Sequence, residues 1–335
     1  MAKKVKLAFI GCGGIAAHHL SAEMGGLGQF PDVEFVGWCD VNEAAAEARR
    51  AQVGDRGDVY TNAKKMLDQT RPDAVYIMLP PFAHGPSEKL VIERKLPFFI
   101  EKPVAIDMPT ARRIAAGVKR ARLITSVGFM SRYRQGVRRV RDLLAKQKPV
   151  IMHGGWTGGG VGYNIRWWHQ KDKSGGQFLE QTIHTVDLAR YFFGEVTRVY
   201  AVPINDRRRQ PSFVDIEQAS MVQLTFAGGA AANLYSTTCT PIGGDVTLEI
   251  FATGMKARLD GWGCKTTIEL AGGEKVNIPD EDGIFGIEDR VFIDAVKAAK
   301  RGGIEATYED GVKATQIACA ANKSMETGKV IQLRH

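Results

Sequence analysis

The chain has 335 residues, 44% of them hydrophobic and 24% charged, which is ordinary globular usage and enough for two domains with cores of their own. Its apolar runs are only strand-length, so we expect a soluble protein without a membrane span. The formal net charge of +8 is spread along the chain, with the arginines at 207–209 as the only compact triple, which argues against a nucleic-acid partner. The cysteines are odd in number and scattered, which favours a reducing cytoplasm and argues against structural zinc; they are Cys12, Cys39, Cys239, Cys264 and Cys319.

The first predicted strand, Val5–Ile10, leads directly into a glycine-rich turn. The turn has the pattern GxGxxA, whose small residues allow a tight turn, a close backbone approach to a pyrophosphate, and close packing of a helix on the strand. The helix that follows, predicted through about residue 24, offers its N-terminal N–H groups and partial positive charge to phosphates. The cofactor-binding residues predicted here are Gly11, Cys12, Gly13, Gly14 and Ile15.

A second predicted strand, Val33–Cys39, ends at Asp40. An acid at this position accepts hydrogen bonds from the hydroxyls of an adenosine ribose. No arginine that would bind a 2′-phosphate follows it immediately, so NAD is favoured and NADP is the alternative cofactor. The competing role for Asp40 is the N-cap of a helix predicted over 43–51.

Strands and helices continue to alternate as far as residue 128. We predict further strands at 59–60, 74–78, 98–100 and 123–128, and helices at 63–68, 85–94 and 110–121. This succession is typical of a doubly wound parallel sheet.

Two strand ends in this region carry the other residues predicted to bind the cofactor. Leu79, Pro80 and His84 follow the fourth strand, and Glu101 and Lys102 follow the fifth. Ligands bind at the carboxyl ends of the strands in such sheets, so a lysine there is placed for chemistry; the simpler alternative is a surface ion pair. We also predict a cis peptide bond between Lys102 and the proline after it, since X-Pro is the only common place for one.

Beyond residue 128 the pattern changes. A basic helix over 133–145 and a strand over 150–156 lead into a glycine- and tryptophan-rich loop at 158–169. Tryptophan faces stack on the CH surfaces of polyols while arginine reaches their hydroxyls, so the loop fits the wall of a sugar site; an interface or a core plug is the alternative. The predicted substrate-binding residues are Arg132, Tyr163, Arg166, Trp167, Trp168, Gln181 and His184.

The segment 174–194 has apolar residues at helical spacing, and Gly194 marks the C-terminal end of a helix. Glu180, His184 and Asp187 are spaced i, i+4 and i+7, so we expect them on one face of this helix. Neighbouring carboxylates can fix the tautomer of His184. A metal site is the competing use of Glu and His at this spacing.

The remainder consists of strands joined by glycine-rich turns, followed by two helices. We predict strands at 198–204, 219–226, 230–237, 245–252, 256–260 and 265–270, and helices at 287–301 and 310–327. Strands linked by short turns form an antiparallel sheet. The predicted domains are therefore a nucleotide-binding domain over 1–128 and an α+β domain over 129–335, and the packing of the last helices back on the first domain is left open.

Together these motifs resemble the glucose-fructose oxidoreductase, inositol dehydrogenase and MocA family. The resemblance rests on GxGxxA after the first strand, Glu101-Lys102-Pro103 after the fifth, and Ser174-Gly-Gly followed by the His184-x-x-Asp187 helix, and it covers nearly the whole chain. It implies a Rossmann domain, a substrate domain on an open, mainly antiparallel sheet, and homodimers or homotetramers formed through that sheet.

The resemblance also implies roles at matching positions. Lys102 matches the family's catalytic lysine and His184 its catalytic histidine, while Glu180 stands where many members have an aspartate. The predicted catalytic residues are therefore Lys102, His184 and Glu180. His84 matches the histidine that usually follows the fourth strand. Two departures from the family pattern are Pro81, in place of a common asparagine, and the extra methylene of Glu180.

These assignments predict NAD(P)-dependent oxidation of a secondary alcohol on a sugar, sugar derivative or cyclitol. One of Lys102 and His184 takes the hydroxyl proton while the other bonds the oxygen, and the resemblance favours His184 as the base. Two other functions stay open. One is an NAD-retaining enzyme that cleaves glycosides or epimerises by transient oxidation, and the other is a non-catalytic nucleotide sensor, against which the lysine and histidine count.

Overall fold

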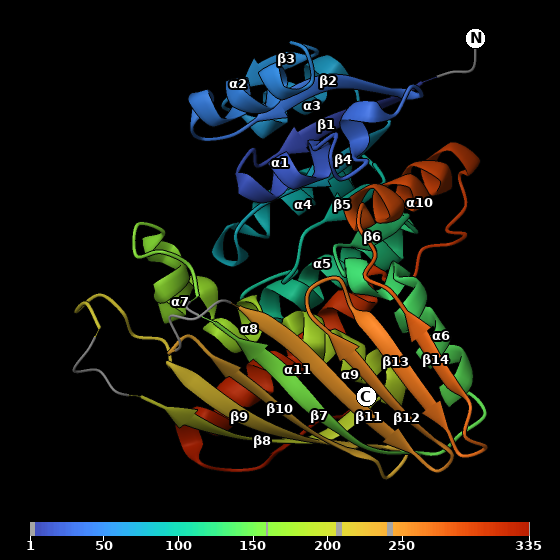
Figure 1. Ribbon diagram of the computed structural model, residues 1–335. Coiled ribbons are helices and arrows are strands. Elements are labelled where there is room, and N and C mark those ends of the chain that lie inside the picture. Colours follow the sequence, from blue (N-terminus) through green and yellow to red (C-terminus); the bar gives the residue numbers. More distant parts are fainter. Residues whose placement is uncertain (1–3, 159, 206–209, 240–243, 335) are drawn as a thin grey trace. The chain divides into compact units, whose positions relative to one another are not determined.

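The computed structural model describes residues 4–158, 160–205, 210–239 and 244–334, and the arginines at 207–209 lie outside these ranges. The chain divides into two compact units (Figure 1). Unit 1 comprises Met1–Ala105, Pro109–Met130 and Asp282–Val312, and unit 2 comprises Ile106–Met108, Ser131–Glu281 and Lys313–His335. The boundary between the units at Met130 lies two residues beyond the predicted boundary at 128. Unit 1 also includes a segment near the C-terminus, Asp282–Val312. In the part of the chain that the structure describes, no helix is both long and apolar enough to cross a bilayer.

Unit 1 is built on a six-stranded parallel sheet in the order β3-β2-β1-β4-β5-β6, which confirms the predicted doubly wound sheet. Its strands are β1 (Val5–Ile10), β2 (Val33–Cys39), β3 (Asp58–Tyr60), β4 (Ala74–Ile77), β5 (Phe98–Ile100) and β6 (Thr125–Val127). Its helices are α1 (Gly14–Leu20), α2 (Glu43–Gln52), α3 (Ala63–Thr70), α4 (Pro86–Glu93), α5 (Met108–Ala121) and α10 (Ile284–Ala298), with short 3-10 turns η1 (Leu27–Gln29) and η2 (Pro81–Ala83). Helix α1 ends before residue 24 because Ser21 is already extended.

Aromatic side chains form a row across the central strands of this sheet. The strand register places Trp38, Phe9, Tyr76 and Phe99 opposite one another on β2, β1, β4 and β5. Successive rings are stacked, with centroids 4.8, 4.9 and 5.0 Å apart. Phe292 of α10 packs edge-on against the rings of Tyr76 and Phe99, at 5.5 and 5.9 Å. This packing joins α10 to unit 1, although the whole of 131–281 intervenes in the sequence.

Unit 2 is built on a nine-stranded sheet in the order β14-β13-β12-β11-β7-β10-β9-β8-β15. Every neighbouring pair is antiparallel except β7 and β10, which run parallel, so the sheet is mainly antiparallel as predicted. Its strands are β7 (Pro149–Thr157), β8 (Val196–Ile204), β9 (Ala219–Phe226), β10 (Ala231–Thr237), β11 (Asp245–Ala252), β12 (Met255–Asp260), β13 (Lys265–Leu270), β14 (Lys275–Ile278) and β15 (Ile331–Gln332). The two edge strands, β14 and β15, were not predicted because they are short and carry few buried side chains.

Helices cover one face of this sheet (Figure 1). The helical segments are η3 (Met130–Tyr133), α6 (Gln135–Leu144), η4 (Arg166–His169), α7 (Lys171–Ser174), α8 (Gln177–Glu180), α9 (Ile183–Phe193) and α11 (Tyr308–Thr327), the last of which begins in unit 1. Helices α6, α8 and α9 pack on the strands. Along β8 and β9 buried and exposed residues alternate, so the opposite face of these strands carries exposed apolar side chains, namely Tyr200, Val202, Ile204 and Met221.

Candidate active site

The glycine-rich turn lies at the carboxyl end of the parallel strands in unit 1. Gly11 has a φ of +92°, and its N–H donates to the carbonyl of Cys39 at 2.8 Å. A Cβ at Gly11 would collide with the carbonyl of Met78 and lie 3.1 Å from the side chain of Leu79. The turn therefore needs glycine at this position for both its backbone angle and its close approach to the end of strand β4.

Asp40 is held beside this turn by backbone donors. Its Oδ2 accepts a hydrogen bond from Cys12 N and its Oδ1 accepts one from Asn42 N, both at 2.8 Å. The N-cap of α2 is Asn42, whose side chain accepts from Ala44 N at 3.2 Å, so the competing N-cap role does not fall to Asp40. A carboxylate fixed at the end of β2 beside the glycine-rich turn fits the hydroxyls of an adenosine ribose.

Gly13 and Gly14 leave open space next to the start of α1. A Cβ at either residue would meet no heavy atom within 4 Å, so packing inside the protein does not require glycine there. Gly13 is the N-cap of α1 and, lacking a side chain, leaves the first N–H groups of the helix to a ligand. Burial, reinforced by Asp40, raises the pKa of the Cys12 thiol to about 12, so the turn carries no thiolate. These features fit the pyrophosphate of a dinucleotide, and Ile15 packs against the core below.

His84 is the buried polar residue of the loop after β4, which begins with Leu79 and Pro80. Its Nδ1 lies 2.6 Å from Oε1 of Glu88, whose Oε2 accepts a hydrogen bond from Gly85 N. Its Nε2 is buried and has no hydrogen-bond partner among the described residues. Buried polar atoms are nearly always satisfied, so this nitrogen fits a loop that a bound ligand completes.

Glu101 and Lys102 follow β5, and the bond between Lys102 and Pro103 is cis, as predicted. Glu101 is only 4% exposed, so the alternative of a surface ion pair at this stretch is wrong. Its Oε2 accepts a hydrogen bond from Lys102 N at 3.1 Å, and its Oε1 lies 3.1 Å from Nε2 of His19. The carboxylate therefore fixes the backbone from which the Lys102 side chain extends.

In unit 2, helix α9 carries His184 and Asp187, both buried. Asp187 forms a two-pronged ion pair with Arg132 of η3, with Nε to Oδ2 at 2.7 Å and Nη2 to Oδ1 at 2.6 Å. The guanidinium of Arg132 also lies over the ring of Tyr191, 4.7 Å from its centroid. The structure thus places Arg132, predicted to bind substrate, in a buried ion pair.

Glu180 does not share a helical face with His184, so the prediction of one face is wrong at this residue. Helix α8 ends at Glu180, and the N–H of Thr182 donates to the carbonyl of Gln177, five residues earlier, at 3.0 Å. This wider turn changes the helical register before α9 begins. The Oε2 of Glu180 accepts a hydrogen bond from the indole N–H of Trp168 at 2.7 Å.

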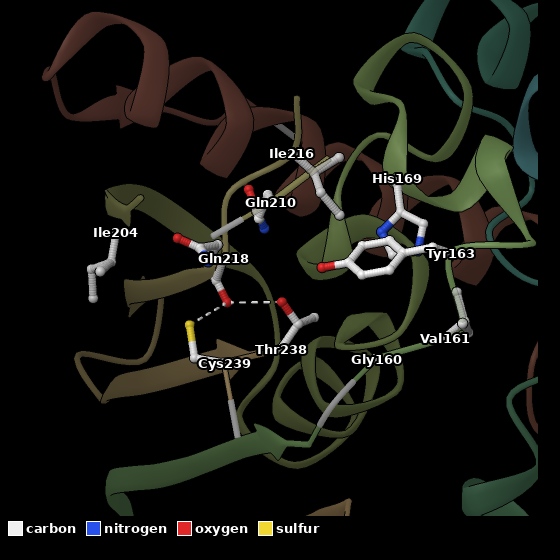
Figure 2. A pocket seen from close by; sticks show the side chains of 11 residues that line it. Gly160, Val161, Tyr163, His169, Ile204, Gln210, Ile216, Gln218, Thr238 and Cys239 are labelled. Atoms are coloured by element: carbon white, nitrogen blue, oxygen red, sulfur yellow. Dashed lines mark hydrogen bonds between the residues drawn. The ribbon is translucent and has the colours of Figure 1, made fainter. Parts of the chain in front are cut away.

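The loop after β7 lines a cavity of about 540 Å³ in unit 2 (Figure 2). Tyr163 and His169 stand side by side at its wall with ring centroids 4.9 Å apart, and burial lowers the pKa of His169. On another wall, Thr238 Oγ1 and Cys239 Sγ both donate to the carbonyl of Gln218. The described lining offers aromatic, imidazole, amide, hydroxyl and thiol groups, which can form hydrogen bonds to a polar ligand.

The other residues predicted to bind substrate have varied surroundings. Trp168 is 2% exposed and packs with Val214 and Ile216, so it is a core plug, the alternative that the sequence left open for this loop. Trp167 packs against the same cluster, and the guanidinium of Arg166 lies 5.0 Å above the ring of Phe213. Gln181 accepts a hydrogen bond from the side chain of Gln177 at 3.2 Å.

Sequence reasoning missed Trp262, which contacts the ring of His184. The two rings are perpendicular, with centroids 5.5 Å apart, and Trp262 is 42% exposed. Trp156 also packs edge-on against Trp262, with ring centroids 5.4 Å apart. The only signal in the sequence is a tryptophan in the glycine-rich turn between β12 and β13, where a polar residue would be expected.

Comparisons with known proteins show the family of the chain. Residues 5–129 match the GFO/IDH/MocA oxidoreductase family with an NAD-binding Rossmann fold, and residues 138–258 match the C-terminal domain of the same family. An uncharacterized oxidoreductase of Bacillus subtilis, YrbE, is 25% identical and aligns over 100% of this chain and 98% of its own length. The crystal structure of myo-inositol 2-dehydrogenase from Lactobacillus plantarum has a TM-score of 0.83 and 25% identity, covering 99% of this chain and 100% of that one. GenD2 from gentamicin A biosynthesis, crystallised with NAD, has a TM-score of 0.84 at 20% identity and covers 100% and 98%, which shows the same fold. Because the family models match residues 5–129 and 138–258, which together are more than half of its length, the chain belongs to the GFO/IDH/MocA family of NAD-binding oxidoreductases.

Proposed function

We propose that this protein is an NAD-dependent dehydrogenase that oxidises a secondary hydroxyl of a sugar, sugar derivative or cyclitol. The observation that carries the proposal is the placement of Lys102 at the carboxyl end of an NAD-binding sheet, on a backbone that Glu101 holds. Bound NAD supplies the hydride acceptor. A proton must leave the hydroxyl in the same reaction, and this is the part that the side chains of the protein perform.

In this proposal Lys102 and His184 share the proton chemistry. The imidazole of His184 accepts the hydroxyl proton, and the ammonium of Lys102 donates a hydrogen bond to the oxygen as negative charge develops on it. Trp262 orients the imidazole through its edge-on contact. Glu180, whose Oε2 accepts the indole N–H of Trp168, is the third candidate catalytic residue of the proposal.

In this proposal, NAD is bound by the glycine-rich turn, Asp40, the loop of His84, and Glu101. The carboxylate of Asp40 would accept bonds from ribose hydroxyls and repel a 2′-phosphate, which supports NAD over NADP. The substrate side rests on relatives named myo-inositol 2-dehydrogenase, which align over 98% and 99% of this chain.

A screen for substrate-dependent reduction of NAD tests the proposal. Sugars, inositols and glycosides are offered with NAD or NADP, and the absorbance of reduced nicotinamide is followed. We expect one polyol class to react with NAD, with the signal retained in Lys89→Ala, which removes an exposed lysine of α4, and lost in Lys102→Ala. Tightly bound NAD with turnover of a glycoside but no net reduction would instead favour the NAD-retaining alternative, and NAD binding without any turnover would favour a sensor.

The exposed face of β8 and β9 supports a homodimer or homotetramer formed through the sheet of unit 2. Val202 and Met221 are paired across the two strands and are 43% and 46% exposed. Light scattering of Met221→Lys should show a smaller particle than the wild type, while Thr61→Lys, which adds the same charge at an exposed site in unit 1, should not. Free thiols throughout the chain support a reducing, cytoplasmic location as part of the same proposal.

A further inference from the structure

A buried cluster of charged side chains lies behind Glu101 in unit 1, outside the chemistry proposed above. His19 of α1 is fully buried, with its Nδ1 2.9 and 3.0 Å from the two carboxylate oxygens of Asp289 on α10. Its Nε2 lies 3.1 Å from Oε1 of Glu101, whose Oε2 accepts the N–H of Lys102. A continuous chain of hydrogen bonds therefore runs from α10 through α1 to the peptide of Lys102.

The geometry defines the charge of His19. Both ring nitrogens face carboxylate oxygens, so both carry protons, because a neutral ring would point a lone pair at one carboxylate. Burial by itself lowers the pKa of His19, but the charges and hydrogen bonds of Asp289 and Glu101 outweigh burial and hold that pKa well above its ordinary value. Glu288, also fully buried, places an oxygen within 4.8 Å of ligand atoms of His19 and Glu101. The imidazolium is thus the cation that Asp289 and Glu101 share. Burial raises the pKa of Asp289, and the charge and hydrogen bond of His19 oppose that rise.

The carboxylate of Glu101 lies against the backbone at the end of β6, where a glycine leaves space for it. A Cβ at Gly128, the residue after this strand, would collide with Oε1 of Glu101 and lie 2.9 Å from its Oε2. The side chain is therefore enclosed between His19 and the backbone of Gly128, and it has one orientation in which both of its oxygens are bonded. If the imidazolium were absent, this carboxylate would be left buried without its cation and would turn away or take up a proton.

We propose that His19, anchored by Asp289, is a positioning residue that holds Glu101 and, through it, the peptide of Lys102 in the geometry that the reaction requires. The kinetic part of this inference rests on the proposed dehydrogenase function. The structural part does not, because it concerns the hydrogen bond between Glu101 and Lys102 N. A displacement of a reacting group by about 1 Å can lower a rate about 100-fold, so a loosened Lys102 should be visible in kcat.

The first variant removes the imidazolium of His19. His19→Gln should lower kcat by about 10- to 100-fold while the dissociation constant for NAD changes by only a few-fold, because the phosphate-binding turn is untouched. His18→Gln is the matched control, since His18 is the neighbouring, exposed histidine of the same helix. It should behave like the wild type in both measurements.

Asp289→Asn gives a second, pH-dependent readout. The amide oxygen can still accept a hydrogen bond from Nδ1, but the charge that favours the imidazolium is gone. The polar and titratable groups facing His19 are then Glu101, Glu288, the Asn amide and Tyr76, and the rings of Phe99 and Phe285 also contact it. We expect kcat near the wild-type value at acidic pH and an early fall on the alkaline side that the wild type does not show.

Amide hydrogen exchange at Lys102 tests the structural part of the inference independently of the kinetic part. Exchange should accelerate at this amide in His19→Gln and in Gly128→Ala, which disturbs Glu101 while leaving every charge in place, and it should stay unchanged in His18→Gln. If His19→Gln fails to fold, which thermal unfolding would reveal, exchange at Lys102 in Asp289→Asn at alkaline pH, compared with the wild type at the same pH, supplies the test. Unchanged exchange, or faster exchange with wild-type kcat, would overturn the positioning role. If the wild type itself oxidises no polyol, the proposed function fails, and the exchange at Lys102 still decides whether His19 positions it.

Discussion

At the scale of residues, the buried ion pair between Arg132 and Asp187 joins η3 to helix α9. Both side chains are buried, and each carboxylate oxygen accepts one guanidinium N–H. Asp187→Asn leaves a buried guanidinium without its counter-charge, so we expect a loss of about 3 to 5 kcal/mol in the free energy of unfolding, measured with denaturant. The double variant Arg132→Met with Asp187→Leu should recover most of that loss. A cost below about 1 kcal/mol for Asp187→Asn would contradict the importance of the pair.

At the same scale, we expect Asp40 to set the choice between NAD and NADP. Its carboxylate accepts bonds from the backbone and is available to ribose hydroxyls. Asp40→Ala should weaken NAD binding by about 1.5 to 3 kcal/mol, the usual range for hydrogen bonds to a charged group, and weaken NADP binding less, because a repulsion is removed too. Calorimetric titration with both cofactors measures this. Glu43→Ala, an exposed acid in the first turn of α2, is the control, and equal losses for the two cofactors would rule out the selective role.

At the scale of elements, we expect the glycines of the turn between β1 and α1 to have two different roles, one structural and one in ligand binding. Gly11→Ala forces a Cβ into the carbonyl of Met78 at a φ of +92°, so we expect a loss of at least about 1 to 3 kcal/mol in stability together with weaker NAD binding. Gly13→Ala has a φ of −75° and open space, so it should keep the stability of the wild type and lose affinity for NAD. Thermal unfolding with and without NAD distinguishes the two variants. Equal destabilisation by both would contradict this division.

The helices and strands also show how much of the fold could be predicted from the sequence. The buried parallel strands were predicted well, because a short, continuous apolar run between glycines and polar turns is typical of a strand covered on both faces. The i, i+4 spacing of Glu180 and His184 predicted one face and was wrong, since the wide turn at Thr182 depends on how α8 packs and not on local periodicity. The pairing of β7 with β10 in parallel was also beyond local pattern, because the register of distant strands is a tertiary property.

For the site, the sequence located single residues but not their partners. Lys102 and the cis bond after it could be predicted from three adjacent residues. The contact of Trp262 with His184 joins two parts of the chain that no motif links, and His19 meets Asp289 across 270 positions of sequence. Buried side-chain networks of this kind form only in the folded chain, so a single sequence offers little sign of them.

For the whole molecule, His19 should make stability depend on pH. Its folded pKa is raised, so the stability it contributes is fully present below its ordinary pKa of about 6.5 and is lost as pH rises through the folded value. The difference in melting temperature between the wild type and His19→Gln should therefore be largest in acid and neutral solution and should narrow toward high pH. Melting curves across this range, with His18→Gln as the control, measure the effect. A difference that grows with pH would contradict a protonated His19.

The measurement that tests the central claim most directly is the rate of NAD reduction with the best polyol from the screen, compared among the wild type, Lys102→Ala and His184→Gln. Proton transfer by a positioned side chain contributes about 100- to 10,000-fold, so each variant should lose that much in kcat while still binding NAD. Wild-type rates in both variants, or an NAD-bound wild type that reduces no cofactor with any polyol, would contradict a dehydrogenase that works through these two residues.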